Sequence, residues 1–220
     1  MVITCFMPTG TERIVVLNHP LPFIKHSLSP FPSGPKVTST KHSLVYSTTH
    51  DPSTGTAIIH SQSAASWISP PGADVAFNLI YTTSEFPAQL TDEVDIKQHE
   101  SVVASRKLGL VNPNGTICRM VDFKPGSTPL MHRTQSLDYG IVLEGSVIME
   151  LDSGEKVQLH RGDVAVQRAT MHAWRNASET DWARIVFVLQ DCQPLLVGGQ
   201  RLKEDLGHAT EAIPPSGNDK

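Results

Sequence analysis

The sequence has few cysteines, few charges and no long apolar run, and each shortage excludes a class of protein. Its three cysteines, Cys5, Cys118 and Cys192, are scattered and odd in number, so they predict neither a disulfide framework nor a CxxC zinc or redox site. Unpaired thiols fit a reducing compartment, and we expect a cytoplasmic protein. The apolar residues 1–7 carry no basic lead, so they predict neither a signal peptide nor a membrane span.

Charge and cofactor motifs are also sparse. Only 18% of the residues are charged and the formal net charge is -4, which favours neither a nucleic acid nor a membrane surface as partner. No GxGxxG or P-loop glycine pattern is present, so no nucleotide cofactor is predicted. A chain of 220 residues without an internal repeat has room for one sizeable core plus an extension, and two full domains are not predicted.

Short alternating runs of apolar and polar residues fill the stretch 126–176, with turn residues between them. This alternation, with a turn every eight to twelve positions, predicts an antiparallel all-β fold. The four expected strands are 139–143, 147–151, 156–159 and 164–167.

The remainder of the chain divides into an arm, an extension and a tail. We predict a partly irregular N-terminal arm over 1–43, a β-rich extension over 44–110 that packs on the barrel, the barrel itself over 111–197, and a tail over 198–220. The arm contains a β-branched run at 14–17 that predicts a strand. Within the extension, we predict a hairpin over 44–60, a strand over 75–83, and a loop or short helix over 92–100. The tail predicts one or two helical turns over 200–207 and a mobile end.

The spacing within 126–176 carries a family resemblance. The chain reads Gly126, five residues, His132, one residue, Thr134, three residues, Asp138, six residues, Gly145. This resembles the first signature of the cupin superfamily, which usually has a second His and a Glu at the third and fourth of these places. The second signature is similar to the series Gly162, Gln167, Ala169, His172 and Asn176.

The resemblance implies a single cupin barrel, a double-stranded β-helix or jelly roll. More locally, the stretches 131–134, 137–140, 166–168 and 172–176 resemble the small cupins encoded in fungal secondary-metabolite clusters, many of them associated with polyketides. One fold hosts many chemistries, so the reaction has to be argued from the site residues.

Four residues stand at the ligand positions that the resemblance implies: His132, Thr134, Asp138 and His172. Residues two apart in a strand face the same side, so His132 and Thr134 point together, and the cupin pattern aims them into the barrel. Two imidazoles and one carboxylate compose the facial triad that holds non-haem Fe(II), and the set also suits Mn or Zn. We therefore predict a divalent metal at His132, Asp138 and His172, with Thr134 beside it.

A metal-free reading of the same residues stays open. A carboxylate within reach of an imidazole raises the pKa of the imidazole and fixes its tautomer, which gives a base that takes a proton next to a carbonyl. Four further residues are predicted to bind the substrate: Gln167, Trp174, Met131 and Met120.

Two classes of function follow from these residues. The first is an enzyme that acts on a small, polyketide-type molecule by proton transfer, meaning dehydration, decarboxylation or cyclisation, with Fe(II)-dependent oxidation as the alternative. The second is a non-catalytic cupin that binds a small molecule. We also expect a homodimer in which the run 14–17 covers an open sheet edge.

Overall fold

The computed structural model describes residues 43–70, 72–211 and 213–219. The predicted arm, with its strand at 14–17, lies outside the described residues. Within the described ranges, no helix is long and apolar enough to cross a membrane.

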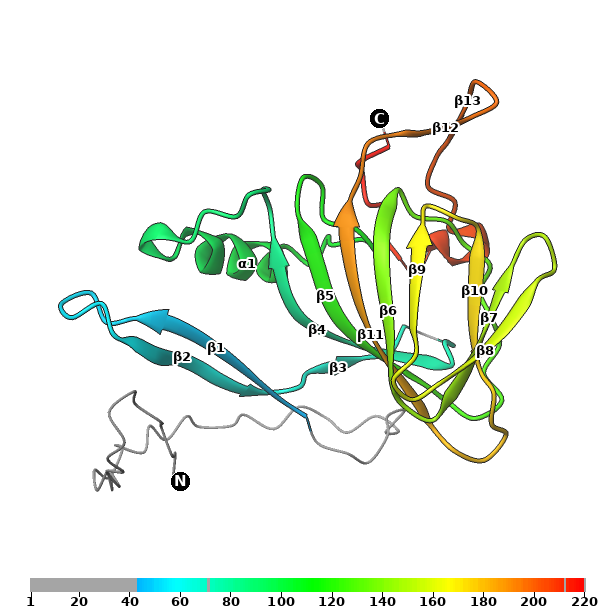
Figure 1. The fold of residues 1–220 in the computed structure, drawn as a ribbon, viewed down its shortest axis with the longest axis horizontal. Coiled ribbons are helices and arrows are strands. Elements are labelled where there is room, and N and C mark those ends of the chain that lie inside the picture. The colour runs from blue at the N-terminus through cyan, green and yellow to red at the C-terminus, as the bar shows by residue number, and fades with distance from the viewer. Residues whose placement is uncertain (1–42, 71, 212, 220) are drawn as a thin grey trace, which may run out of the picture. The chain divides into compact units, whose positions relative to one another are not determined.

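Two antiparallel sheets make up the barrel (Figure 1). The larger has six strands in the order β3-β4-β5-β11-β6-β9 and the smaller has three in the order β10-β7-β8. Alternating sequence produces these strands because a sheet with one face in the core buries every second side chain. The strands of the larger sheet are β3 Trp67–Ile68, β4 Val75–Thr83, β5 Thr116–Phe123, β6 Ser136–Glu144, β9 Val164–Arg168 and β11 Ala183–Asp191. Those of the smaller are β7 Ser146–Leu151, β8 Lys156–His160 and β10 His172–Asn176.

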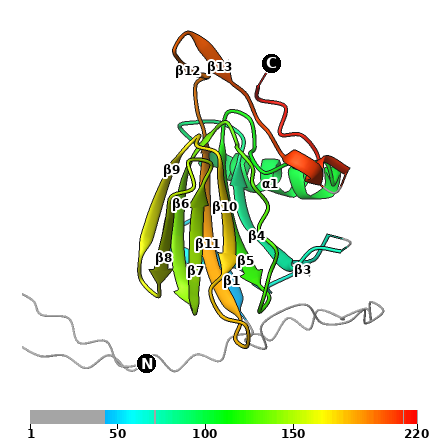
Figure 2. The same ribbon diagram turned by 90° about the vertical axis from the view of Figure 1, so that its right-hand side faces the viewer.

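The core lies between the two sheets, which confirms the predicted all-β cupin fold. Trp174 of β10 packs edge-on against Phe187 of β11, with ring centroids 5.4 Å apart. The turned view in Figure 2 shows β7, β8 and β10 beside β6, β9 and β11. The residues buried in this core are Val121, Phe123, Val142, Val147, Leu159, Ala165, Trp174, Ala183 and Ile185.

The segment that precedes the barrel contributes a hairpin, two sheet strands and a helix. The predicted hairpin is present as β1 Leu44–His50 and β2 Ala57–Ala64. Strands β3 and β4 join the larger sheet through the pairing of β4 with β5. The acidic stretch forms a 3-10 turn, η1 Thr91–Glu93, and then a helix, α1 Val94–Ser105, which runs five residues past the predicted end.

Helix α1 is fixed to β4 by a small polar cluster. His99 of the helix stacks on Tyr81, with ring centroids 4.6 Å apart, and its Nδ1 accepts a hydrogen bond of 3.2 Å from the backbone N–H of Thr82. Tyr81 donates a hydrogen bond of 2.6 Å to Asp95. These contacts hold the helix against the C-terminal part of β4.

The C-terminal segment corrects the prediction of helical turns over 200–207 and a mobile end. It forms a hairpin, β12 Leu195–Val197 with β13 Gln200–Leu202, and then a 3-10 turn, η2 Gly207–Glu211. Ser216 is buried, and its hydroxyl accepts a hydrogen bond of 3.0 Å from the backbone N–H of Val111 and donates one of 2.5 Å to Glu204. These long-range hydrogen bonds, which a pattern of local residues does not reveal, hold the segment against the barrel.

Candidate functional site

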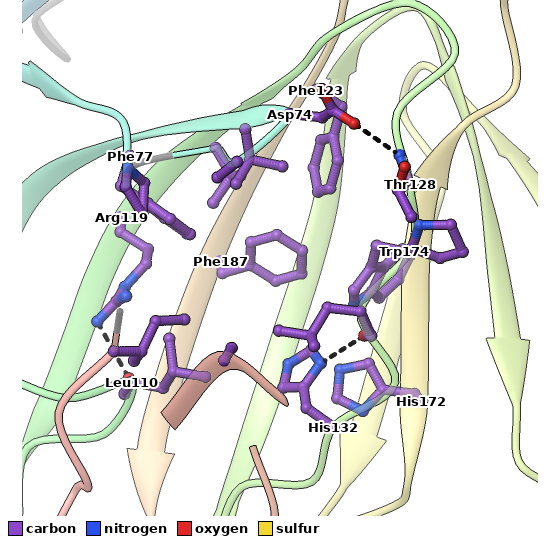
Figure 3. Close-up of a pocket in the computed structure, with 18 of the residues that line it drawn as sticks. Asp74, Phe77, Leu110, Arg119, Phe123, Thr128, His132, His172, Trp174 and Phe187 are labelled. Carbon is purple, nitrogen blue, oxygen red and sulfur yellow. Dashed lines mark hydrogen bonds between the residues drawn. The ribbon is translucent and has the colours of Figure 1, made fainter. Parts of the chain in front are cut away.

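A cavity of about 520 Å³ opens between the inner face of the larger sheet, strand β10 and the C-terminal segment. Its volume is in the range of small-molecule sites, which are apolar pockets with a few convergent polar groups. The aromatic walls come from four different strands: Phe77 on β4, Phe123 on β5, Phe187 on β11 and Trp174 on β10 (Figure 3). The polar groups among them are Arg119, His132, Asp138, His172, Asp74, Thr128 and His208.

The two predicted histidines face each other on one side of this cavity. Their ring centroids are 4.5 Å apart, because residues 132 and 172 form an isolated antiparallel bridge between the segment before β6 and the start of β10. The Nδ1 of His132 lies 3.0 Å from the carbonyl oxygen of Leu130, and the Nδ1 of His172 lies 2.8 Å from that of Thr170. A carbonyl oxygen only accepts, so each Nδ1 carries the proton and each Nε2 is left as an acceptor.

Burial keeps both imidazoles neutral. Loss of solvent lowers the pKa of His132, and loss of solvent together with the neighbouring His132 lowers the pKa of His172 to about 3. A neutral imidazole accepts a proton, so at neutral pH the pair is a base and not a cation.

Asp138 lies on the inward face of β6, 4% exposed, in a different electrostatic setting. Burial raises its pKa to about 6, although hydrogen bonding and the charge of Arg119 act in the opposite direction. Its Oδ2 accepts a hydrogen bond of 3.5 Å from Thr134, whose own oxygen accepts one of 2.8 Å from Ser136. The other oxygen, Oδ1, is buried without a hydrogen-bond partner. Asp138 is thus a carboxyl group that exchanges its proton near neutral pH.

The divalent metal predicted at His132, Asp138 and His172 stays a prediction, and these three residues line one cavity. In the part of the chain that the structure describes, no group of three or more His, Cys, Asp or Glu side chains lies close enough together to hold a metal ion. His132 and His172 are adjacent, but Asp138 is occupied with Thr134 and shares its surroundings with Arg119. The ionisable side chains that line the cavity near the histidines are thus two imidazoles, one carboxyl group and one guanidinium.

The predicted substrate-binding residues fall into two groups. Trp174 lines the cavity, beside His172, at a centroid distance of 5.9 Å. Gln167 is buried but does not line it, because its amide contacts Met149 and accepts a hydrogen bond from Thr170. Met131 and Thr134 are also outside the set of lining residues.

Met120 requires a correction, because it lies on the face of β5 turned away from the cavity. Side chains alternate along a strand, and Arg119 and Val121 on either side of it line the cavity. Met120 pairs with Asn78 of β4 and Val186 of β11. It is a buried packing residue, 9% exposed.

The sequence did not single out Arg119 of β5, which lines the cavity, or Gly140 of β6, which lies against two of its rings. The side chains of β5 that point into the barrel are those of residues 117, 119, 121 and 123, and all except Arg119 are apolar. A charged residue among apolar inward positions is unusual, so the sequence could have identified Arg119. A Cβ at Gly140 would lie 3.0 Å from Cε1 of Phe187 and 3.6 Å from Cη2 of Trp174, so this glycine leaves room for the two rings. His208, in the 3-10 turn η2, also lies at the cavity wall.

Comparisons with known proteins agree with this geometry. Residues 119–189 match the family model of the cupin domain. The chain is 44% identical over 142 residues to phomopsin biosynthesis cluster protein D of Diaporthe leptostromiformis, covering 64% of this chain and 75% of the relative. It is 43% identical over 133 residues to oryzines biosynthesis cluster protein J of Aspergillus oryzae, and the match covers 60% of this chain and 74% of that relative. It is 41% identical over 137 residues to the cupin-domain-containing oxidoreductase srdB of Neurospora crassa, and the match covers 62% of this chain and 67% of that relative.

The fold and these relatives define the class of the protein as an all-β cupin barrel. The chain belongs to the cupin family, in the group of cupin proteins from fungal biosynthesis clusters.

Proposed function

We propose that the protein is an enzyme of fungal secondary metabolism that transfers protons on a small oxygenated molecule in the barrel cavity. The reaction class is dehydration, decarboxylation or cyclisation of a polyketide-type substrate. One observation carries the proposal: two neutral imidazoles, each with Nδ1 held on a backbone carbonyl, line the same cavity as a buried carboxyl group.

The titration of these groups supports opposite roles for them. Acid and base in one site are recognised as titratable groups whose surroundings drive their pKa values apart. Burial lowers the pKa of both histidines, so the imidazoles are unprotonated at neutral pH, and raises the pKa of Asp138 to about 6, so this carboxyl group carries a proton in part of the population. In this proposal an imidazole Nε2 takes the proton from the carbon next to a carbonyl, and Asp138 in its protonated form gives a proton to the departing hydroxyl group.

The fixed tautomer supports the imidazole as the base. An imidazole that is free to rotate presents either nitrogen, whereas the carbonyls of Leu130 and Thr170 keep the Nδ1 protons of His132 and His172 in place. The acceptor nitrogen is therefore already formed before the substrate enters. Such preorganisation lowers the reorganisation cost of proton transfer.

A second candidate is an oxidoreductase, because four relatives carry that word in their names: srdB and srdD of Neurospora crassa, virC of Hypocrea virens and fogC of Aspergillus ruber. An oxidoreductase has to pass electrons to an acceptor, such as molecular oxygen or an added cofactor. The two candidates therefore differ in whether the product has the same oxidation state as the substrate.

The mass of the product tests the choice. The purified full-length protein is incubated with a panel of β-hydroxy aryl ketones and aryl β-keto acids, in air and without oxygen, and the products are analysed by mass spectrometry. Loss of water or carbon dioxide in both atmospheres supports proton transfer. A gain or loss of two hydrogens, or a gain of one oxygen, supports the oxidoreductase instead. Ligand binding without turnover of any compound would favour a non-catalytic binding protein.

A further inference from the structure

A buried cation that forms no salt bridge with any described residue stands at the wall of the cavity, and the charge of Asp138 acts on it from beyond salt-bridge distance. Arg119 is 9% exposed. Its Nη2 donates hydrogen bonds of 2.9 Å and 3.1 Å to the carbonyl oxygens of Gly109 and Leu110, while its Nε is buried without a partner. No carboxylate of the described residues forms a salt bridge with it within 4.0 Å.

An isolated buried charge is costly, so buried guanidinium groups are normally paired. Burial lowers the pKa of Arg119 to about 10, so the group remains a cation at neutral pH. The two backbone carbonyls hold one end of the guanidinium and leave its Nε free, which gives Arg119 a fixed position and an unused donor. A ligand oxygen with a negative charge would satisfy both the charge and the donor.

The cavity presents flat apolar walls next to this cation. The Arg119 guanidinium lies over the ring of Phe77, 5.9 Å from its centroid. Figure 3 shows Arg119 on one side of the cavity and the histidine pair on the other, with Phe187 between them. A planar ring placed over Phe187 therefore has Arg119 at one end and the proposed base at the other. Aromatic rings pack well against such surfaces in offset or edge-on geometry.

A second unused donor lies near the histidines. The indole Nε1 of Trp174 is buried without a hydrogen-bond partner, and buried indole N–H groups usually have one. Trp174 and Arg119 come from strands of different sheets, β10 and β5. Their unsatisfied donors are explained together if one ligand supplies oxygen atoms at both ends.

We propose that the cavity binds a planar aromatic molecule with an anionic oxygen, a carboxylate or a phenolate, and that Arg119 anchors this oxygen. The assignment names the substrate class of the acid–base site proposed above and rests on that function. Arg119 is a binding residue in this account, and the reacting bond lies at the histidine end of the ring.

Isothermal titration calorimetry of the full-length protein with two matched probes, 2-naphthoate and 2-naphthamide, tests the proposal. They share one ring system and differ in charge. Because a hydrogen bond to a charged group outweighs a neutral one, we expect the wild type to bind the acid about 10- to 100-fold more tightly. Titration with 4-nitrophenol, whose phenolate is yellow, then distinguishes a phenolate preference from a carboxylate preference.

Three variants assign the effect to the anchor. Arg119→Gln is expected to bind acid and amide equally, and Arg119→Lys to keep part of the preference because the charge remains. Arg168→Gln makes the same change at an exposed position at the end of β9 and should behave like the wild type. A thermal melt of each variant checks that it is folded. If Arg119→Gln does not fold, the comparison between the wild type and Arg119→Lys decides.

Equal affinity of the wild type for acid and amide, or no binding of either, would overturn the anchor. So would an undiminished preference in a folded Arg119→Gln protein. Because calorimetry needs no turnover, this failure is distinguishable from failure of the acid–base function. If the anchor is wrong, the protein shows no preference for the acid over the amide, but catalysis still depends on the histidines. If the acid–base function is wrong, the preference for the acid is present, but the histidines are dispensable.

Discussion

His132 and His172 are joined through their main chains as well as through their rings. The N–H of each donates a hydrogen bond of 2.9 Å to the carbonyl of the other, and the ring centroids lie 4.5 Å apart. The backbone bridge fixes the separation of the two rings, and the bonds from Nδ1 to Leu130 and Thr170 fix their orientation. Four hydrogen bonds thus hold the proposed base without any contribution from a ligand.

The raised pKa of Asp138 predicts a pH-dependent stability difference for Asp138→Asn. The folded protein holds the proton of Asp138 more tightly than the unfolded chain, with a pKa of about 6 against 3.8. The contribution of Asp138 to the free energy of unfolding is therefore largest below pH 4 and is lost as the pH rises through about 6. Asn cannot ionise, so the variant should match the wild type at pH 4 and be about 2 to 3 kcal/mol more stable at pH 7.5.

Urea unfolding at the two pH values measures this difference. His172 works in the opposite sense, because its pKa is lowered and its contribution is lost as the pH falls from about 6.5 toward 3. It is present in both proteins and cancels in the comparison. Asp152→Asn, in an exposed turn, is the control and should change stability by less than about 0.5 kcal/mol at either pH. A difference for Asp138→Asn that does not vary with pH would contradict the prediction.

Gly140→Ala is expected to destabilise the protein by about 1 to 3 kcal/mol through overpacking. The added methyl group would meet the ring of Phe187 at 3.0 Å and that of Trp174 at 3.6 Å, and these two rings pack edge-on against each other. In a Phe187→Leu background the smaller side chain leaves space, so the same change should cost much less. Thermal unfolding of the four proteins of this double-mutant cycle gives the coupling free energy. A coupling near zero would show that Gly140 is not required for space.

Asp122 and Arg184 form a salt bridge whose loss should be costly. Arg184 donates hydrogen bonds of 2.6 Å and 2.8 Å to the two carboxylate oxygens of Asp122, and the side chains are 4% and 0% exposed. Removing one member of a buried pair leaves an uncompensated charge, so Asp122→Asn should lower the free energy of unfolding by about 3 kcal/mol.

The half-exposed pair of Lys156 and Glu150, 3.0 Å apart, provides the matched control. Glu150→Gln should cost less than about 1 kcal/mol, because solvent screens the interaction. Chemical denaturation of both variants compares the two sites. Equal costs would contradict the assignment of Asp122 as a stabilising buried partner.

The homodimer expected through the run 14–17 stays a prediction, and the outer face of β6 and β9 is a further apolar surface of the described residues. Tyr139 and Val166 are opposite each other in the register of these strands and are 39% and 54% exposed, and Val164 beside them is 54% exposed. Contiguous exposed apolar residues of this kind mark interaction surfaces. Light scattering at micromolar concentration should give twice the chain mass of 24.0 kDa. The mass of a single chain would contradict the expectation.

The barrel could be predicted from sequence because its signals are local. Alternation has a period of two, and turn residues such as Gly145 and Gly154 separate the strands, so strand positions follow from short windows. The spacing of His132 and His172 within a family pattern then placed both imidazoles on the inner face. Backbone geometry determines where the strands lie and which side chains point inward, and contacts between side chains change these two features little.

The arrangement of the cavity could not be predicted in the same way. Whether the carboxylate of Asp138 turns toward the histidines or toward Thr134 depends on packing between strands that are far apart in sequence. The same holds for Arg119, whose position is set by the carbonyls of Gly109 and Leu110 in the loop before β5. Met120 lies on the other face of β5 because the inward series is 117, 119, 121 and 123, in which the charge of Arg119 interrupts the apolar alternation.

The proposed acid–base role of the histidine pair is tested most directly by solvent deuterium exchange. An aryl ketone that binds in the cavity is incubated in D2O with the wild type, His132→Asn, His172→Asn and Arg168→Gln, and deuterium at the carbon next to the carbonyl is followed by NMR. We expect catalysed exchange in the wild type and in Arg168→Gln, and a rate lower by about 10²- to 10⁴-fold in at least one histidine variant that still binds the ketone. Exchange at the wild-type rate in both folded histidine variants would contradict the account.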